Sequence, residues 1–223
     1  MARMLGIVTI GQAPRDDIAE LFAAQAPAGT KVVLRGALDG LSDEEIDALL
    51  PESGADTLYT RLRGGRDVKI SKKAVIERSP AALDRLRADG CDALVYACTG
   101  EFPPMAGDEN VLFPSRVLNG LAAGLLPRGR LGLLIPLAEQ GEKLASKWAR
   151  PGLDVVAEAL APSAGPEEAA AAADRLAARK PDLVAMDCMS YTPATKGWVK
   201  GPLGVPTLLA ITATGRVLRE MLD

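Results

Sequence analysis

Two cysteines stand at the ends of apolar runs that share a pattern. Residues 92–100 read DALVYACTG and residues 182–191 read DLVAMDCMSY, so an aspartate precedes each of Cys98 and Cys188 by six positions. A cysteine on an apolar strand is usually a buried small hydrophobic residue, and Cys91 is expected to be one. Cys98 and Cys188 differ because each ends its strand and is followed by groups able to bind an oxyanion. The pattern predicts two reactive thiols at the same place in two related halves.

Two opposed thiols suit the movement of a proton from one face of a carbon to the other. One cysteine must be a thiolate to abstract the proton, and the other must be a thiol to deliver one. Removal of a proton beside a carboxylate creates extra negative charge, so the site must supply N–H groups, helix N-termini or hydroxyls placed for that charge. Cys98 and Cys188 are therefore the predicted catalytic residues.

Strand ends and helix starts supply the predicted substrate-binding residues. They are Gly11, Gln12, Arg15, Thr99, Gly100, Arg116, Met189, Ser190 and Tyr191. For Arg15 and Arg116, a solvated surface charge is the alternative. Asp187 would oppose ionisation of Cys188 if it points inward, which favours Cys98 as the resting thiolate, but it has no effect if it faces away.

The composition excludes several classes of site. The chain of 223 residues contains no histidine, which rules out a Ser-His-Asp triad, a Cys-His pair and a His-ligated metal. Three cysteines make neither a disulfide framework nor a zinc site, and a nucleotide site lacks its glycine-rich loop. The net charge of -3 shows no basic excess for nucleic acid or an acidic membrane. The opening MARMLGIVTIG is expected to be a first strand, and the protein cytoplasmic.

Short apolar runs alternate with helix-like stretches, which predicts an α/β fold with mainly parallel sheets flanked by helices. Leu-Gly opens the expected strands at residues 5 and 131, and each precedes a cysteine strand. We therefore expect two similar lobes, related by a pseudo-twofold axis, with the active site between them. The predicted boundaries are 1–113 plus 206–223 for the N-terminal lobe, with a hairpin insertion at about 56–71, and 114–205 for the C-terminal lobe.

The chain resembles the aspartate/glutamate racemase superfamily, and within it the AroM family. The superfamily resemblance rests on Cys98-Thr99-Gly100, on Cys188 and on GIVTIGQAPR near the start of the chain; TIGQAPRDD, LSDEEI, GADTLYTRL, VKISKKAV, FPSRVL, LGLLIP, MDCMSY and GVPTLLA extend the AroM resemblance along nearly the whole sequence. The resemblance implies a two-lobed fold, no cofactor, and an active site with one cysteine from each lobe. Met189 stands where the superfamily usually has threonine and offers no hydroxyl.

The leading hypothesis is a cofactor-independent racemase or epimerase of a small carboxylate, an amino acid or a derivative of one. The alternatives are a cis-trans isomerase or decarboxylase of a small dicarboxylate, and a non-catalytic binding protein. The expected partner is the small carboxylate, with neither nucleic acid nor membrane, and the sequence leaves a homo-oligomer open. The basic hairpin, with Arg61, Arg63, Arg66 and Lys69, is a solvated edge or subunit contact in preference to a carboxylate clamp.

Overall fold

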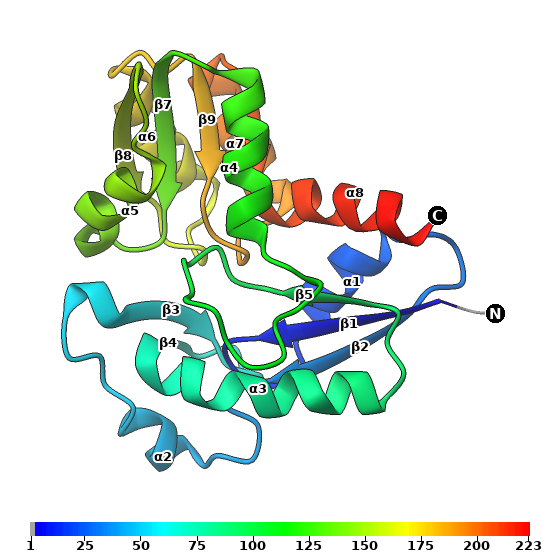
Figure 1. Cartoon of the computed structure of the whole chain (residues 1–223). Coiled ribbons are helices and arrows are strands. Elements are labelled where there is room, and N and C mark those ends of the chain that lie inside the picture. The colour runs from blue at the N-terminus through cyan, green and yellow to red at the C-terminus, as the bar shows by residue number, and fades with distance from the viewer. Residues whose placement is uncertain (1–2) are drawn as a thin grey trace. The chain divides into compact units, whose positions relative to one another are not determined.

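The computed structural model describes residues 3–223 and separates the chain into two compact units. The first contains the residues up to Pro114 together with Thr214–Asp223, and the second is Ser115–Ala213. Each unit holds a four-stranded sheet whose strands all run parallel, with helices packed against it (Figure 1). The α/β class predicted from the alternation of apolar runs and helical patterns is confirmed.

The sheet of the first unit has the strand order β2-β1-β5-β6. Its strands are β1 (Met4–Thr9), β2 (Lys31–Gly36), β5 (Ala93–Tyr96) and β6 (Val111–Leu112). Its helices are α1 (Asp16–Ala23), α2 (Asp43–Asp47) and α3 (Lys72–Ala88), and a short 3-10 turn, η1 (Gly54–Asp56), follows α2. Alternate side chains of β1 and β5, such as Val8 and Tyr96, share one core with apolar side chains of α3, such as Leu83.

A hairpin joins this same core. β3 (Thr57–Arg61) and β4 (Asp67–Ser71) pair antiparallel on either side of a turn in which Gly65 has a positive φ of 83°. Leu58 and Ile70 are its buried residues in the core, whereas Arg61 and Asp67 form an ion pair of 2.8 Å at its partly exposed end. The hairpin that the Gly-Gly sequence predicts is therefore an integral layer of the first unit.

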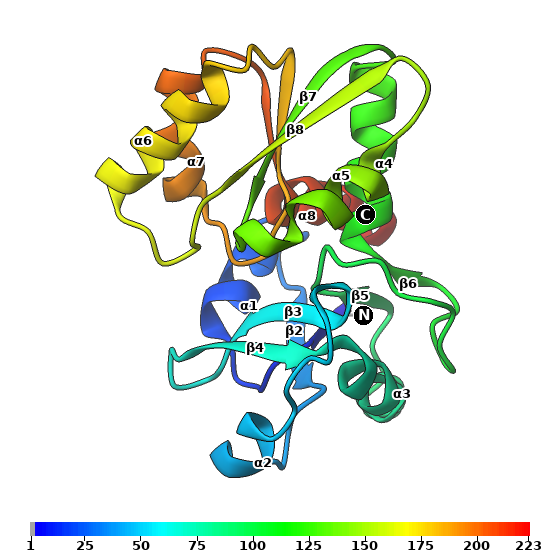
Figure 2. The ribbon, with the colours of Figure 1, turned by 90° about the vertical axis from the view of Figure 1, so that its left-hand side faces the viewer.

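The sheet of the second unit has the order β10-β9-β7-β8. Its strands are β7 (Gly129–Ile135), β8 (Leu153–Ala159), β9 (Leu183–Met186) and β10 (Thr207–Leu209). Helices α6 (Pro166–Ala177) and α7 (Pro193–Leu203) lie together on one face, with α4 (Pro114–Leu125) and α5 (Gly141–Trp148) on the other (Figure 2). A 3-10 turn, η2 (Ala138–Gln140), precedes α5, and α8 (Ala210–Leu222) ends the chain.

The pairing of β10 bears on the predicted boundaries. β10 pairs in parallel with β9, and the second unit extends to Ala213. The predicted boundaries instead assign residues 206–223, and with them β10, to the N-terminal lobe. A three-residue strand carries no pattern that tells which sheet it joins, so its partner could not be read from the sequence.

The two sheets repeat one plan, because β1, β2, β5 and β6 correspond in order to β7, β8, β9 and β10. The correspondence extends to single hydrogen bonds. The Asp92 amide donates to the Met4 carbonyl, and the Met4 amide donates to Asp92 Oδ2 at 2.7 Å. Asp182 exchanges the same two bonds with Arg130, each at 2.8 Å. Each aspartate thus starts its cysteine strand by bonding to the first residues of the neighbouring inner strand, β1 or β7, which we call the central strand of its sheet.

Candidate active site

Cys98 and Cys188 occupy equivalent positions at the carboxyl ends of β5 and β9. The amide of Ala97 donates to the Val8 carbonyl of β1, and the amide of Asp187 donates to the Leu134 carbonyl of β7. Each cysteine is the next residue. In open parallel sheets these strand ends are where ligands bind. The positional repeat seen in the sequence is therefore present in the backbone of both units.

The chain turns back immediately after Cys98, and the turn places a donor at the sulfur. The amide nitrogen of Gly100 lies 3.4 Å from Cys98 Sγ. A Cβ at Gly100 would lie 3.2 Å from the Phe102 ring and 3.4 Å from that sulfur, so only glycine fits this turn without pressure on its neighbours. Cys98 itself is half-buried, and Thr99 is buried. The three residues of the predicted Cys-Thr-Gly motif thus form one compact group.

Tyr96 supports this group from inside the core. Its ring is fully buried and lies 4.8 Å from Phe102 and 5.4 Å from Phe113, measured between ring centroids. Its hydroxyl lies 2.6 Å from Ser79 Oγ, which itself donates to the Val75 carbonyl. Burial raises the pKa of Tyr96 strongly; the Ser79 hydrogen bond lowers it, and the nearby Cys98 raises it further. Tyr96 therefore stays protonated at neutral pH and does not act as a base in place of the thiols.

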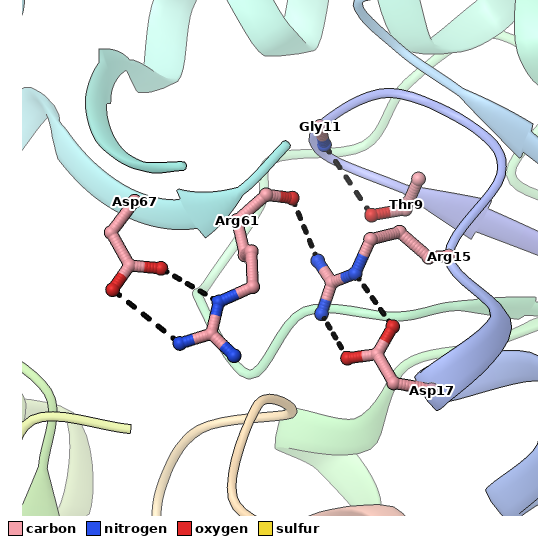
Figure 3. A network of polar contacts seen from close by, with 6 residues as sticks. All are labelled: Thr9, Gly11, Arg15, Asp17, Arg61 and Asp67. Atoms are coloured by element: carbon pink, nitrogen blue, oxygen red, sulfur yellow. Dashed lines mark hydrogen bonds and ion pairs between the residues drawn. The ribbon is translucent and has the colours of Figure 1, made fainter. Parts of the chain in front are cut away.

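The loop after β1 is fixed by the hairpin. Arg15 donates from Nε and Nη2 to the carboxylate of Asp17 at 2.8 and 2.7 Å, and from Nη1 to the Arg61 carbonyl at 2.8 Å (Figure 3). The Gly11 amide donates to Thr9 Oγ1, and a Cβ at Gly11 would lie 2.8 Å from Thr60 Oγ1 of β3. Glycine is needed there because the hairpin approaches so closely.

These contacts show where the predicted binding residues of this loop lie. Only 4% of Arg15 is exposed, and three of its N–H groups are bonded within the first unit. Gln12 is buried as well, and its Nε2 donates to the Leu41 carbonyl at 3.0 Å. Because β1 and β5 are neighbours in a parallel sheet, this loop and the Cys98 turn leave the same edge.

In the second unit, the residues after Cys188 form a buried turn. Cys188 is 8% exposed and Met189 4%, whereas Ser190 is half-buried. The Tyr191 ring is fully buried, and its hydroxyl donates to the Leu160 carbonyl, just beyond β8, at 2.6 Å. Arg116 lies apart from this turn in the chain, exposed in the first turn of α4.

Asp187 points inward, which the alternation of side chains along a strand left open. Its carboxylate accepts from Lys147 Nζ at 3.0 and 2.8 Å and from Trp148 Nε1 at 2.8 Å. The side chains of Lys147 and Asp187 are 1% and 0% exposed. Sequence reasoning missed Lys147, because a lysine near the end of a short amphipathic helix normally reaches solvent. An aspartate at the end of an otherwise apolar strand was the one available signal.

The AroM protein family matches residues 5–222. The chain belongs to the AroM family. A comparison with curated proteins finds no match. Among solved structures, the AroM chain is similar to arylmalonate decarboxylase, with 17% identity, a TM-score of 0.63 and coverage of 98% of this chain and 92% of that one.

Two further structures share this AroM fold. The maleate isomerase Iso from Pseudomonas putida S16 has 13% identity and a TM-score of 0.65, with 100% of this chain and 93% of that one covered. Glutamate racemase from Francisella tularensis subsp. tularensis SCHU S4, in complex with D-glutamate, has 13% identity and a TM-score of 0.60, with 99% and 81% covered. At these identities the likeness shows the fold, which confirms the two-lobed architecture implied by the resemblance.

Two features are absent from residues 3–223, the part of the chain that the structure describes. Within that range, His, Cys, Asp and Glu side chains form no group of three or more that could hold a metal ion. The same range contains no helix long and apolar enough to cross a bilayer.

Proposed function

We propose that this AroM family protein is a cofactor-independent racemase or epimerase of a small carboxylate, with Cys98 and Cys188 as its two proton-transfer groups. The observation that carries the proposal is the equivalence of the two thiols. Cys98 follows β5 and Cys188 follows β9, the strands that lie next to β1 and β7. The residue before each cysteine donates its amide to β1 or β7. The presence of a thiol at both equivalent positions suits a reaction that needs one acid and one base.

The proposed reaction balances without a further reagent. The thiolate of one cysteine takes the hydrogen of the carbon beside the carboxylate as a proton, and the C–H electron pair is delocalised into the carboxylate. The thiol of the other cysteine then delivers its proton to the opposite face of that carbon and becomes the thiolate. The substrate leaves inverted, and the two cysteines have exchanged protonation states.

Charge that develops on the carboxylate requires donors, and those close to the thiols are the natural candidates. We propose Thr99 on one side and Ser190 on the other, because each lies within two residues of its cysteine, whereas the Gly100 amide is directed at Cys98 Sγ. The same bond supports Cys98 as the resting thiolate. Arg15 and Gln12 are instead proposed to hold the β1 loop, since their polar groups are bonded within the first unit.

The proteins of similar fold include a decarboxylase and an isomerase as well as racemases. A decarboxylase or cis-trans isomerase of a small dicarboxylate is therefore the second candidate. In a decarboxylase, one thiol would protonate the enediolate left after loss of carbon dioxide. In an isomerase, a cysteine would attack the substrate as a nucleophile.

The test is incubation with small carboxylates, amino acids and dicarboxylates in deuterated buffer, followed by chiral chromatography and mass spectrometry. The proposed reaction inverts the substrate and leaves solvent deuterium at the inverted carbon. Cys98→Ser and Cys188→Ser should each abolish inversion, because a hydroxyl is far too weak an acid for the step, whereas Cys91→Ser should keep it. Full activity of both Cys98→Ser and Cys188→Ser would rule out the two-thiol mechanism. Carbon dioxide release, or double-bond isomerisation without deuterium, would favour the second candidate.

A further inference from the structure

The buried ion pair of Lys147 and Asp187 lies directly beside the candidate catalytic Cys188. Lys147 and Trp148 are the last two residues of α5, and both donate to the Asp187 carboxylate. Lys147 Nζ also lies 5.3 Å from the centre of the Trp148 ring. Three hydrogen bonds therefore attach the end of β9 to the last turn of this helix.

A buried ion pair is weak evidence for stability. Removing two charges from water is costly, and well-packed apolar residues of similar size often stabilise a protein as much or more. The first unit shows that the strand end itself needs no such pair, since the residue equivalent to Asp187 is Ala97. Ala97 makes the same backbone bond to its central strand with no side chain beyond Cβ. Neither stability nor the pairing of the strand end therefore explains the Lys147–Asp187 pair, which leaves a role at the adjacent Cys188.

The turn that carries Cys188 is held at both ends. On one side, Asp187 is bonded through its amide to β7 and through its carboxylate to α5. On the other side, the Tyr191 hydroxyl is bonded to the Leu160 carbonyl. The thiol thus lies on a short segment fixed to three different elements of the second unit.

Charge explains why an ion pair suits this position. A lone aspartate beside Cys188 would oppose its thiolate form, and a lone lysine would favour that form. A thiol that must alternate between both forms is best held by a support with no net charge. The Lys147–Asp187 pair makes two of the three hydrogen bonds that hold this strand end, Trp148 donates the third, and the pair adds no net charge.

We propose that Lys147 and Asp187 are positioning residues, which fix the Cys188 turn for proton transfer without biasing its charge. This inference rests on the proposed function of Cys188 as a proton-transfer group. Lys147 and Asp187 act through the backbone of the Cys188 turn, because both side chains are buried. Trp148 completes the support as the third donor.

The experiment uses the full chain and a pair of substitutions that separates positioning from stability. Asp187→Asn and Lys147→Met each leave one buried charge without its present partner, so both should lower the Tm. The double variant Asp187→Asn/Lys147→Met removes both charges, keeps an acceptor for Trp148 and should recover most of the lost Tm. Each variant is treated with iodoacetamide under native conditions, and the alkylation rates of Cys188 and Cys98 are compared by peptide mass spectrometry.

We expect the ratio of the two alkylation rates to change severalfold in the double variant, even with its Tm recovered. We also expect turnover of the substrate to fall by about tenfold or more, with little change in KM, because misplacement of a catalytic group acts on the chemical step. A double variant with recovered Tm, an unchanged ratio and unchanged turnover would overturn the proposal and leave the pair purely structural.

The matched control is Glu158→Gln/Arg175→Met, which removes an ion pair of 2.7 Å from the partly exposed surface of the same unit. It should leave the alkylation ratio and turnover at their wild-type values. The alkylation ratio needs no substrate. If the wild-type chain turns over none of the tested carboxylates, the proposed function fails, while a changed ratio still supports the positioning of Cys188.

Discussion

Replacement of Arg15 by methionine separates two roles for this residue, binding the substrate and holding the β1 loop. The structure favours the second, because Arg15 is 4% exposed and bonded to Asp17 and to the Arg61 carbonyl. Methionine keeps much of the apolar length of the side chain and removes every one of these bonds. The loss of stability therefore reports mainly on the polar contacts.

The magnitude follows from the exposure of each partner. The Asp17 side chain is 48% exposed, so solvent screens the ion pair, and even with its two parallel bonds it contributes about 1 kcal/mol. The bond from Nη1 to the Arg61 carbonyl has a charged donor and is worth about 1.5–3 kcal/mol. We therefore expect Arg15→Met to lower the free energy of unfolding by about 3 kcal/mol. Arg15→Lys should recover only part of it, since lysine lacks the planar fork.

Urea denaturation followed by circular dichroism measures this change. Both tryptophans, Trp148 and Trp198, lie in the second unit, so their fluorescence follows that unit separately. In a double-mutant cycle with Asp17→Asn, the coupling free energy should be about 1 kcal/mol. Arg63→Met is the control, because this arginine is exposed in the hairpin turn of the same unit, and it should change stability by less than about 0.5 kcal/mol. An Arg15→Met variant of unchanged stability but raised KM would refute the reasoning and restore Arg15 as a substrate ligand.

The Arg15–Asp17 pair and the Tyr96–Ser79 pair give two further predictions. Burial raises the pKa of Asp17, but the hydrogen bond and charge of Arg15 outweigh it, so the net pKa lies below the ordinary 3.8. A carboxyl group with a lowered pKa in the folded state stabilises above its unfolded pKa and loses that contribution as the pH falls. The difference in unfolding free energy between wild type and Asp17→Asn should thus shrink from about pH 5 to about pH 3. A constant difference would contradict it. For the buried pair, Ser79→Ala removes the hydrogen-bond partner of the Tyr96 hydroxyl and should cost about 2 kcal/mol in urea denaturation. Tyr96→Phe leaves Ser79 bonded to the Val75 carbonyl and should cost about 1 kcal/mol; the reverse order would disprove this account.

Local pattern was enough to predict most elements of the fold. The capping-box spacing of Ser42 and Glu45 predicts the start of α2, and both of its reciprocal bonds are present. The alanine-rich stretch predicts a helix, and α6 buries Ala169, Ala172 and Ala173 on one face. These features depend on residues a few positions apart, which a sequence shows directly.

The candidate site was predictable only where its evidence is local. The two cysteine strands could be matched by their own residues, and the structure places both thiols after equivalent strand ends. The partner of Asp187 lies 40 positions earlier in the chain, and the partner of the Arg15 Nη1 lies 46 positions later. No periodicity links such distant residues, so the inward direction of Asp187 and the burial of Arg15 emerged only with the fold.

The two halves of the chain differ in how they support their cysteines, and these differences agree with the proposed chemistry. Each turnover begins with one thiolate and one thiol, so the supports of the two cysteines need not match. Cys98 has an amide directed at its sulfur, whereas Cys188 follows a neutral ion pair that holds its backbone. Each thiol alone can still act on the face of the substrate that it reaches. Cys188→Ser should therefore exchange the hydrogen of one enantiomer with deuterated solvent through Cys98, and Cys98→Ser should exchange that of the other through Cys188. Exchange of both enantiomers by either single variant would mean that one thiol reaches both faces, and the halves would then have no separate roles.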